Sequence, residues 1–300
     1  MENNKNTKVT EEDMANGIKD EYGVLYSPDG KRLLKGNYDI AYYAIKEGTE
    51  VICNFAFGWC ISLQSIVIPN SVTRIGNQAF CDCKSLQSIV IPDSVTEIGE
   101  EAFWGCTSLQ SIVIPNSVTE IGNQAFNKCS SLRSIVIPDS VTEIGGGAFS
   151  DCSSLQSIVI PDSVTRIGNQ AFCDCKSLQS IVIPDSVTEI GVRPFDLGKE
   201  LTSHSNRFVV EDDLLIDLEE KRLIQCLKDK DTIVIPESVT KIGNFAFWGC
   251  TFLQSIVIPD SVTEIGAWAF GWCTSLQSIF IPNSVTEIGN SRANAPLQIR

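Results

Sequence analysis

The cysteines are the residues best suited to chemistry in this chain, because eight of the twelve recur at one position of a repeated sequence. These eight are Cys60, Cys83, Cys106, Cys129, Cys152, Cys175, Cys250 and Cys273. A zinc or redox site would need C-x-x-C spacing or a thiolate activated by a neighbouring cation. The two close pairs, Cys81 with Cys83 and Cys173 with Cys175, read C-D-C instead. The spacing therefore predicts a row of buried thiols that act as small apolar residues and stay free, because stacked side chains point the same way.

A single histidine and regular rows of carboxylates are the other chemical candidates. One histidine, His204, excludes zinc sites built from several histidines and any mechanism that needs two, and we expect it at the surface. Carboxylates fill two repeat positions, namely Glu97, Glu120, Glu143 and Glu189, and Asp93, Asp139, Asp162 and Asp185. A regular lattice of this kind indicates a solvated acidic edge, with weak calcium binding as the alternative. With no nucleophile–base pair, phosphate loop or metal cluster, the sequence predicts no enzyme, no metal site and no cofactor.

The net charge narrows the classes of partner. Lys+Arg is 23 and Asp+Glu is 37, which gives a formal charge of −14. That balance argues against nucleic-acid binding and against docking on anionic lipid, both of which need a basic face. No apolar run approaches the roughly 18 residues of a membrane span, so membrane insertion is not expected. The first residues are polar and acidic, unlike a signal peptide, so on this sequence alone the expected location is cytoplasmic.

Internal repetition dominates the chain. The segment LQSIVIP or a close copy begins at Leu63, Leu86, Leu109, Leu132, Leu155, Leu178, Leu253 and Leu276, in steps of 23 residues within each run. Divergent copies begin near Ile40 and Lys230, which makes about ten repeats. Residues 77–99 and 169–191 are identical, which indicates growth by duplication.

Two segments interrupt the repeats and resemble each other. GVLYSPDGKRLLKGN near the start and DLLIDLEEKRLIQCL align without a gap at an offset of 190 residues. Each reads as a β-hairpin, with turns at 28–30 and 219–221. The expected organisation is a disordered segment over 1–21, a hairpin cap and first strand over 22–47, repeats over 48–200, a hairpin insertion over 201–229, and repeats with a degenerate last copy over 230–300.

One repeat is predicted to have three short sides. Ile66, Val67 and Ile68 favour a strand, and Pro69 ends it because proline cannot donate to a ladder. Ala79, Phe80 and Cys83 have the spacing of one helical turn with a buried inner face. Such a repeat cannot bury its apolar edge alone, so copies must stack. The expected fold class is an α/β repeat solenoid of short parallel strands with single helical turns, interrupted by β-hairpins.

The pattern L-x-x-I-x-I-P-x-x-V-x-x-I-G-x-x-A-F-x-x-C resembles the leucine-rich repeats of the BspA-like bacterial surface proteins, also called the Treponema pallidum type. The resemblance covers residues 22–291. It implies a right-handed solenoid with a concave sheet face, and a non-enzymatic protein that is commonly displayed on the cell surface or secreted and linked to adhesion. The visible start of the chain shows no export signal, so surface location and cytoplasmic location both stay open.

Two exposed rows are the predicted binding surfaces. Between the buried strand residues, one row of serines and one of valines should face solvent on the concave side, and its central members are Ser111, Val113, Ser134, Val136 and Val159. A second row holds the tryptophans beside the Ala-Phe pair, of which Trp248, Trp268 and Trp272 lie in neighbouring repeats. Exposed apolar stripes and tryptophans are typical of protein interfaces. The predicted function is non-catalytic binding of a protein partner, adhesin-like or scaffolding, through the concave face.

The alternative function is self-assembly through the last repeat. Arg292, Ala293 and Pro296 stand where the repeat pattern has Ala, Phe and Cys. This change predicts a poorly covered end with an unpaired edge strand, which is a template for another chain. A homodimer through the carboxyl-terminal end is the simplest expected product.

Overall fold

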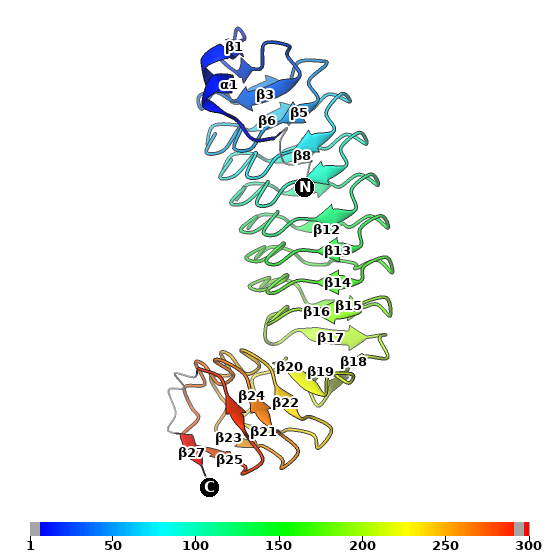
Figure 1. Ribbon diagram of the computed structural model, residues 1–300, viewed down its shortest axis with the longest axis vertical. Helices are drawn as coiled ribbons and strands as arrows, with labels where there is room; N and C mark the ends of the chain where they lie inside the picture. Colours follow the sequence, from blue (N-terminus) through cyan, green and yellow to red (C-terminus); the bar gives the residue numbers. More distant parts are fainter. Residues whose placement is uncertain (1–6, 291–296, 300) are drawn as a thin grey trace. The chain divides into compact units, whose positions relative to one another are not determined.

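The computed structural model describes residues 7–290 and 297–299, and the chain forms two compact units, Met1–Gln179 and Ser180–Arg300. Within each unit, short strands from successive repeats stack as parallel rungs (Figure 1). The predicted solenoid of parallel strands is confirmed, with almost no helix.

The amino-terminal unit contains one short helix and fourteen strands in the described part. Their bounds are α1 Glu11–Asn16, β1 Ile18–Lys19, β2 Leu25–Tyr26, β3 Arg32–Lys35, β4 Tyr42–Ala44, β5 Val51–Ile52, β6 Ser65–Val67, β7 Arg74–Ile75, β8 Ser88–Val90, β9 Glu97–Ile98, β10 Ser111–Val113, β11 Glu120–Ile121, β12 Ser134–Val136, β13 Glu143–Ile144 and β14 Arg166–Ile167. One sheet has the order β12-β10-β8-β6-β4 and a second has the order β1-β2-β3-β5-β7-β9. Each repeat thus contributes one strand to each of two sheet faces.

The carboxyl-terminal unit repeats this plan around the insertion. Its strands are β15 Ser180–Ile183, β16 Glu189–Ile190, β17 Glu200–Ser203, β18 Phe208–Glu211, β19 Leu214–Asp217, β20 Arg222–Cys226, β21 Thr232–Val234, β22 Lys241–Ile242, β23 Ser255–Val257, β24 Glu264–Ile265, β25 Ile279–Ile281, β26 Glu287–Ile288 and β27 Leu297–Ile299. The main sheet has the order β18-β19-β20-β22-β24-β26.

The 23-residue period sets the register between strands. Ser111 pairs with Ser134 and Val113 with Val136, so equivalent residues lie side by side. In β10 the middle residue, Ile112, is buried while Ser111 and Val113 are exposed, as the period-two side-chain geometry of a strand requires. The repeat therefore places one type of side chain in each row across the sheet.

Stacked phenylalanines and cysteines fill the interior. The rings of Phe57, Phe80, Phe103, Phe126, Phe149 and Phe172 form one stack with centroids 5.4–5.5 Å apart. Phe247 and Phe270 stack in the same way at 5.2 Å. At the amino-terminal end Tyr43 follows Phe57 at 6.0 Å, and its hydroxyl bonds Tyr26 and Asp20. Ring offset and burial both stabilise such a stack.

The expected helical turn at Ala-Phe-x-x-Cys is wrong. In the turn around Phe126, alternate amides donate to the next repeat: Gln124 N to Gly146 O, and Phe126 N to Ala148 O, both at 2.8 Å. Gln124 and Lys128 hold left-handed backbone angles, with φ of 53° and 61°, which turns every second amide toward the neighbour. The turns therefore form a third parallel ladder in place of an i to i+4 helical bond.

Residues 7–21 are ordered, contrary to the expected disorder. Thr10 and Asp13 form a reciprocal capping box at the start of α1, and Asp13 pairs with Arg32 at 2.7 Å. The Thr7 carbonyl accepts from Asn54, and β1 runs antiparallel to β2. Contacts to the hairpin β2–β3 thus hold a segment that has no apolar periodicity of its own. Residues 1–6 lie outside the described part.

The insertion also differs from a single hairpin. β19 and β20 form the expected hairpin, but β18 adds a third antiparallel strand, and β17 still pairs in parallel with β15 like a repeat strand. A buried carboxylate supports the extra strand, because Asp217 in β19, at 0% exposure, accepts from Arg207, the residue just before β18, at 3.0 and 2.9 Å. The 23-residue repeat pattern does not predict this ion pair.

The last repeat strand is not an unpaired edge as expected. β25 pairs in parallel with β27, with Ile279 opposite Leu297 and Ile281 opposite Ile299. The tail therefore supplies a strand that the degenerate repeat pattern did not predict. Arg292, Ala293 and Pro296, on which the expectation was based, lie outside the described residues.

Candidate functional site

One sheet face of the amino-terminal unit presents two regular rows to solvent, and we call it the Ser–Val face. It consists of Ser65, Val67, Ser88, Val90, Ser111, Val113, Ser134, Val136, Ser157 and Val159. The valines are 62–77% exposed, with Val113 at 64%, Val136 at 74% and Val159 at 77%. Ser111 and Ser134 are exposed beside them. The predicted exposure is thus confirmed for these five valines and for Ser111 and Ser134, whereas Ser65 is half-buried.

Polar rows flank this stripe on both sides. Gln87, Gln110, Arg133 and Gln156 precede the serines and are exposed. Asp93, Asp139 and Asp162 follow the valines, after the proline that ends each strand, and they are exposed too. An apolar centre with a polar rim is the usual anatomy of a protein interface.

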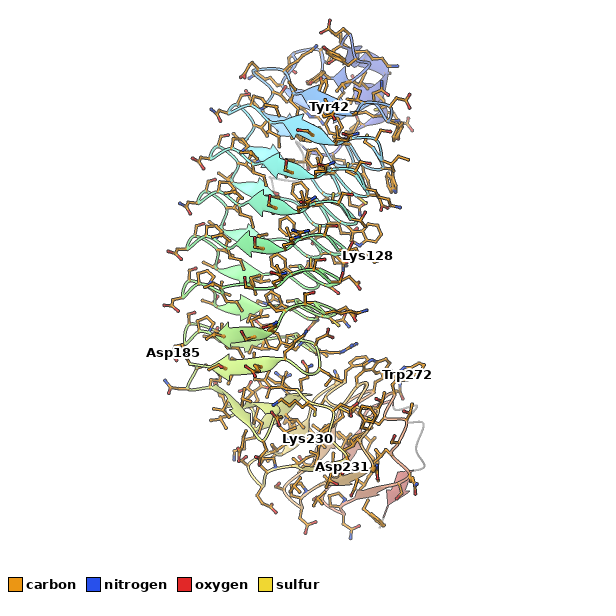
Figure 2. The ribbon with its side chains drawn as sticks, turned by 180° about the vertical axis from the view of Figure 1, so that it is seen from behind. Tyr42, Lys128, Asp185, Lys230, Asp231 and Trp272 are labelled. Atoms are coloured by element: carbon orange, nitrogen blue, oxygen red, sulfur yellow. The ribbon has the colours of Figure 1, made fainter. Side chains whose placement is uncertain are left out.

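Tyrosines line a shallow pocket at the amino-terminal edge of the Ser–Val face. The pocket has a volume of about 390 Å³ and is lined by Tyr22, Tyr42, Tyr43, Ala44, Ser65 and Val67. Tyr42 is 68% exposed, and its hydroxyl donates to Gln64 at 2.6 Å (Figure 2). This pocket is not evident from the sequence, because Tyr22 and Tyr42 lie in divergent segments outside the regular repeats.

The carboxyl-terminal unit carries a matching but separate stretch of exposed apolar residues. Val182, Val234, Val257 and Phe280 are 42%, 60%, 51% and 55% exposed. Val257 and Phe280 line a depression of about 650 Å³ together with Ser255, Asp260 and Asn283. The serine–valine pattern therefore presents an apolar surface in each unit.

Three of the five tryptophans, Trp248, Trp268 and Trp272, gather in one cluster of the carboxyl-terminal unit. Trp248 packs edge-on against Trp268 and Trp272, with centroids 6.0 and 6.3 Å apart, and Phe245 lies 5.3 Å from Trp248. Arg193 lies over the Trp248 ring at 5.9 Å. Trp272 is 58% exposed at the turn side of its repeat (Figure 2), whereas Trp248 and Trp268 are half-buried. Packing within the cluster accounts for two of the three indoles.

The cysteine row is buried and bonded to the backbone. The Cys106 thiol donates to the Phe80 carbonyl at 3.1 Å, and Cys129 donates to Phe103 at 3.2 Å. Burial raises the pKa of both thiols well above the usual range and that of Cys60 to about 11. Neutral, buried thiols of this kind are poor nucleophiles and poor metal ligands.

The charged rows form lateral ion pairs between neighbouring repeats, and Arg74, Glu97 and Glu120 line an open depression of about 470 Å³. Arg74 lies 3.8 Å from Glu97, Arg166 lies 3.4 Å from Glu143, and Lys241 lies 3.1 Å from Glu264, all between neighbouring repeats. Over residues 7–290 and 297–299, no group of three or more His, Cys, Asp or Glu side chains is placed to hold a metal ion. His204 is exposed, as expected. No helix in this described part is long and apolar enough to cross a membrane.

Stacked parallel strands, an inward leucine and isoleucine core and an outward sheet face define a leucine-rich repeat protein. A family model for the BspA type leucine rich repeat region matches residues 50–176, 145–206 and 221–294, so the chain belongs to this family. The expected resemblance is thereby confirmed.

Three solved structures illustrate the similarity. A leucine rich cell surface protein from Faecalibacterium prausnitzii is 30% identical, with a TM-score of 0.75, over 91% of this chain and 84% of that one. The T. pallidum leucine rich repeat protein is 34% identical, with a TM-score of 0.52, over 58% of this chain and 84% of that one. A leucine-rich repeat protein from Bacteroides ovatus shares the fold at 24% identity, with a TM-score of 0.52, over 94% of this chain and 87% of that one. A search of curated proteins found no match.

Proposed function

We propose that the chain is a non-catalytic protein-binding module, adhesin-like or scaffolding, and that the Ser–Val face of the amino-terminal unit receives the partner. The observation that carries the proposal is the stripe of valines, each at least 62% exposed, on a sheet with regular register. A buried valine contributes about 1.5–3 kcal/mol relative to an exposed one, so covering this stripe gives a strong drive for association.

The surroundings of the stripe support a protein partner over a small molecule. The flanking glutamines and aspartates supply a polar rim, and the tyrosine pocket offers a place for one apolar or aromatic side chain of the partner. The surface is open, whereas small-molecule sites bury most of their ligand. Similarity to a cell surface protein supports an adhesin-like role, because such proteins meet partners outside the cell.

A binding experiment with paired variants tests this proposal. The probe is a displayed library of random peptides selected on the wild-type protein. We expect Val113→Glu with Val136→Glu to weaken the selected peptides at least about tenfold, or about 1.4 kcal/mol, because two charges then lie inside the buried stripe. The far-UV circular dichroism should not change, since both sites are exposed.

The matched control puts the same charges on the other sheet face. Thr119→Glu with Thr142→Glu changes two exposed residues of the same repeats and should leave binding intact. If the valine variant binds normally and Trp248→Ser or Trp272→Ser removes binding, the aromatic cluster is the site and the Ser–Val face is not.

A further inference from the structure

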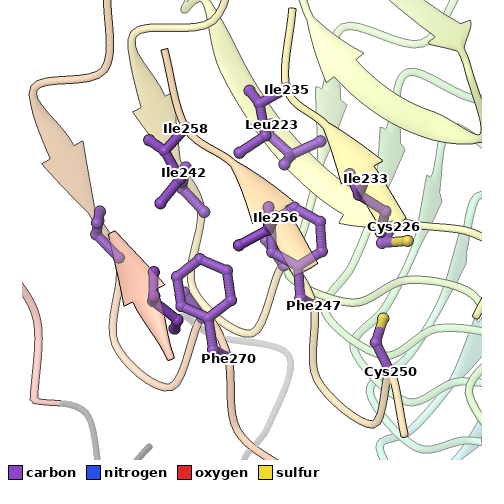
Figure 3. Close-up of a cluster of buried hydrophobic side chains, with 14 of the residues drawn as sticks. Leu223, Cys226, Ile233, Ile235, Ile242, Phe247, Cys250, Ile256, Ile258 and Phe270 are labelled. Carbon is purple, nitrogen blue, oxygen red and sulfur yellow. The ribbon is translucent and has the colours of Figure 1, made fainter. Parts of the chain in front are cut away.

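Two cysteines of the carboxyl-terminal unit lie next to each other in its core. Cys226 ends β20, and Cys250 belongs to the cysteine row of the following repeat; they are 1% and 0% exposed. The Cys250 thiol donates a hydrogen bond to the Cys226 sulfur, and the Cys226 thiol donates to the Lys228 carbonyl at 3.0 Å. Figure 3 shows the Cys250 sulfur directed toward Cys226. The two sulfurs are therefore direct neighbours.

Six of the other seven members of the row, all except Cys60, are held differently. Cys83, Cys106, Cys129, Cys152, Cys175 and Cys273 each donate to the carbonyl of a phenylalanine 26 residues earlier, at 3.1–3.2 Å. These thiols point in the same direction from equivalent positions of stacked repeats. That geometry keeps neighbouring Cβ atoms apart and opposes an unstrained disulfide. Cys250 has a sulfur as its partner in place of that carbonyl.

The amino-terminal module provides an internal comparison. At the offset of 190 residues, Gly36 corresponds to Cys226 and Cys60 to Cys250. The backbone is equivalent, because Gly36 donates its amide to Ala56 and Cys226 donates to Ala246. A Cβ added at Gly36 would lie 2.3 Å from the Phe57 ring, so the first module has no room for a side chain there. The thiol at position 226 is thus a feature of the insertion alone.

We propose that Cys226 and Cys250 form an oxidative modification site, a disulfide generated by exchange with a low-molecular-weight disulfide. The bond would join the end of β20 to the turn of the next repeat. It would fasten the insertion to the second run of repeats and leave the cysteine row of the first run reduced.

The exchange balances in two steps. The Cys226 thiolate attacks one sulfur of the small disulfide, whose S–S bond breaks and releases one small thiolate. Cys250 then loses its proton to solvent, and its thiolate attacks the Cys226 sulfur of the mixed disulfide and expels the second small thiolate. Two protein thiols are oxidised to one disulfide, and the small disulfide is reduced to two thiols.

In the packed core, the surroundings favour the thiolate of Cys226 over that of Cys250. The hydrogen bond from Cys250 lowers the pKa of Cys226 below its ordinary value in spite of burial, while the same bond raises the pKa of Cys250. Because both sulfurs are buried, the exchange takes place while the insertion is packing or when β20 opens locally.

Refolding in a glutathione redox buffer tests the site. The reduced, unfolded protein is refolded in a mixture of reduced and oxidised glutathione, alkylated, and mapped by mass spectrometry without reduction. We expect the number of free thiols to fall from twelve to ten, with one linked pair of peptides that contain Cys226 and Cys250. Cys60 should be alkylated, because its module has Gly36 opposite it.

Two variants serve as controls. Cys129→Ser removes a row cysteine and should keep the disulfide, whereas Cys226→Ser should lose it and leave Cys250 alkylated. Alkylation of both Cys226 and Cys250 in the wild type, a linked Cys250–Cys273 pair, or glutathione retained on Cys226 would each overturn the proposal. The mass-spectrometric map of the wild-type protein tests the Cys226–Cys250 disulfide even if Cys226→Ser fails to fold.

Discussion

At the scale of the residue, each position of the repeat has one structural role. Phe126 stacks on its neighbours, Cys129 satisfies a carbonyl, and Val113 stays in solvent. The sequence could predict these roles, because ten similar copies show which positions keep an apolar residue. It could not predict Cys226, since the contact with Cys250 depends on how the insertion packs and on the lack of a side chain at Gly36 in the equivalent module.

The buried thiols predict a loss of stability at alkaline pH. Burial raises the pKa of Cys106 and Cys129, so these thiols stay protonated in the folded protein. In the unfolded chain they ionise above about pH 8.5, so the unfolded state then binds fewer protons than the folded state. The free energy of unfolding should therefore fall as pH rises from about 8.5, by up to about 1.4 kcal/mol per pH unit for each such thiol.

Thermal unfolding with reductant between about pH 7 and pH 10.5 measures this slope. Cys106→Ala with Cys129→Ala should be less stable near pH 7 but should show a shallower decline at high pH. Ser88→Ala with Ser111→Ala changes the exposed face of the same repeats and should keep the wild-type slope. Equal slopes for the cysteine variant and the wild type would contradict the assignment.

At the scale of the element, the turn is where the sequence interpretation failed. The spacing of Ala79, Phe80 and Cys83 fits a helical turn, but every second amide bonds the next repeat. The left-handed backbone conformation at positions such as Gln124 and Lys128 is unfavourable for most residues. Secondary-structure propensities therefore do not predict it. The stacking of neighbours, which is a tertiary effect, selects this conformation.

The sequence of segment 7–21 contains one pattern that predicts local structure. Thr10 followed by Asp13 is a helix-capping pattern, and both of its reciprocal hydrogen bonds form. The salt bridge from Asp13 to Arg32 is not evident from the sequence, because it joins segments 19 residues apart. Local capping was therefore predictable, and docking on the hairpin was not.

Close stacking of repeats predicts that one glycine position resists any side chain. A Cβ at Gly145 would lie 2.6 Å from the Asn123 amide nitrogen, and backbone atoms cannot move aside as a flexible side chain does. We expect Gly145→Ala to lower the free energy of unfolding by about 1–3 kcal/mol. Denaturant unfolding followed by circular dichroism measures the change.

Gly122 supplies the matched comparison, because it holds the same position one repeat earlier. There the nearest atom, the Glu100 amide nitrogen, lies 3.3 Å from an added Cβ. Gly122→Ala should be clearly milder than Gly145→Ala. A larger loss for Gly122→Ala would show that the distance between stacked repeats does not set the cost.

At the scale of the whole molecule, the sequence identified the family and the run of repeats, but not the partner. Recurring Leu63, Ile66 and Phe80 equivalents are enough to define the solenoid. The sequence does not identify the binding partner in the same way. The exposed rows recur with the same 23-residue period as the core, so their pattern alone does not indicate a ligand. The tyrosine pocket, which breaks the regularity of the Ser–Val face, is the most informative irregular feature.

Self-association through the last repeat remains a prediction of the sequence. Within the described residues β26 has β24 as its one neighbour, and Ile288 is 40% exposed although the equivalent Ile265 is buried. Light scattering over a range of concentrations should show a rising mass for the wild type, because a second copy covers this edge. Ile288→Lys should stay monomeric, and a wild type that is monomeric at the highest concentration would rule the association out.

The identity of residues 77–99 and 169–191 has a genetic consequence. Where coding sequences of such copies match, unequal crossing-over adds or removes four whole repeats and leaves every junction residue unchanged. Because equivalent residues pair with each other at a spacing of 23, the rejoined neighbours meet with the same register and the same stacked rings. The length of the valine stripe, and with it the footprint available to a partner, can therefore change between generations without any new contact having to evolve.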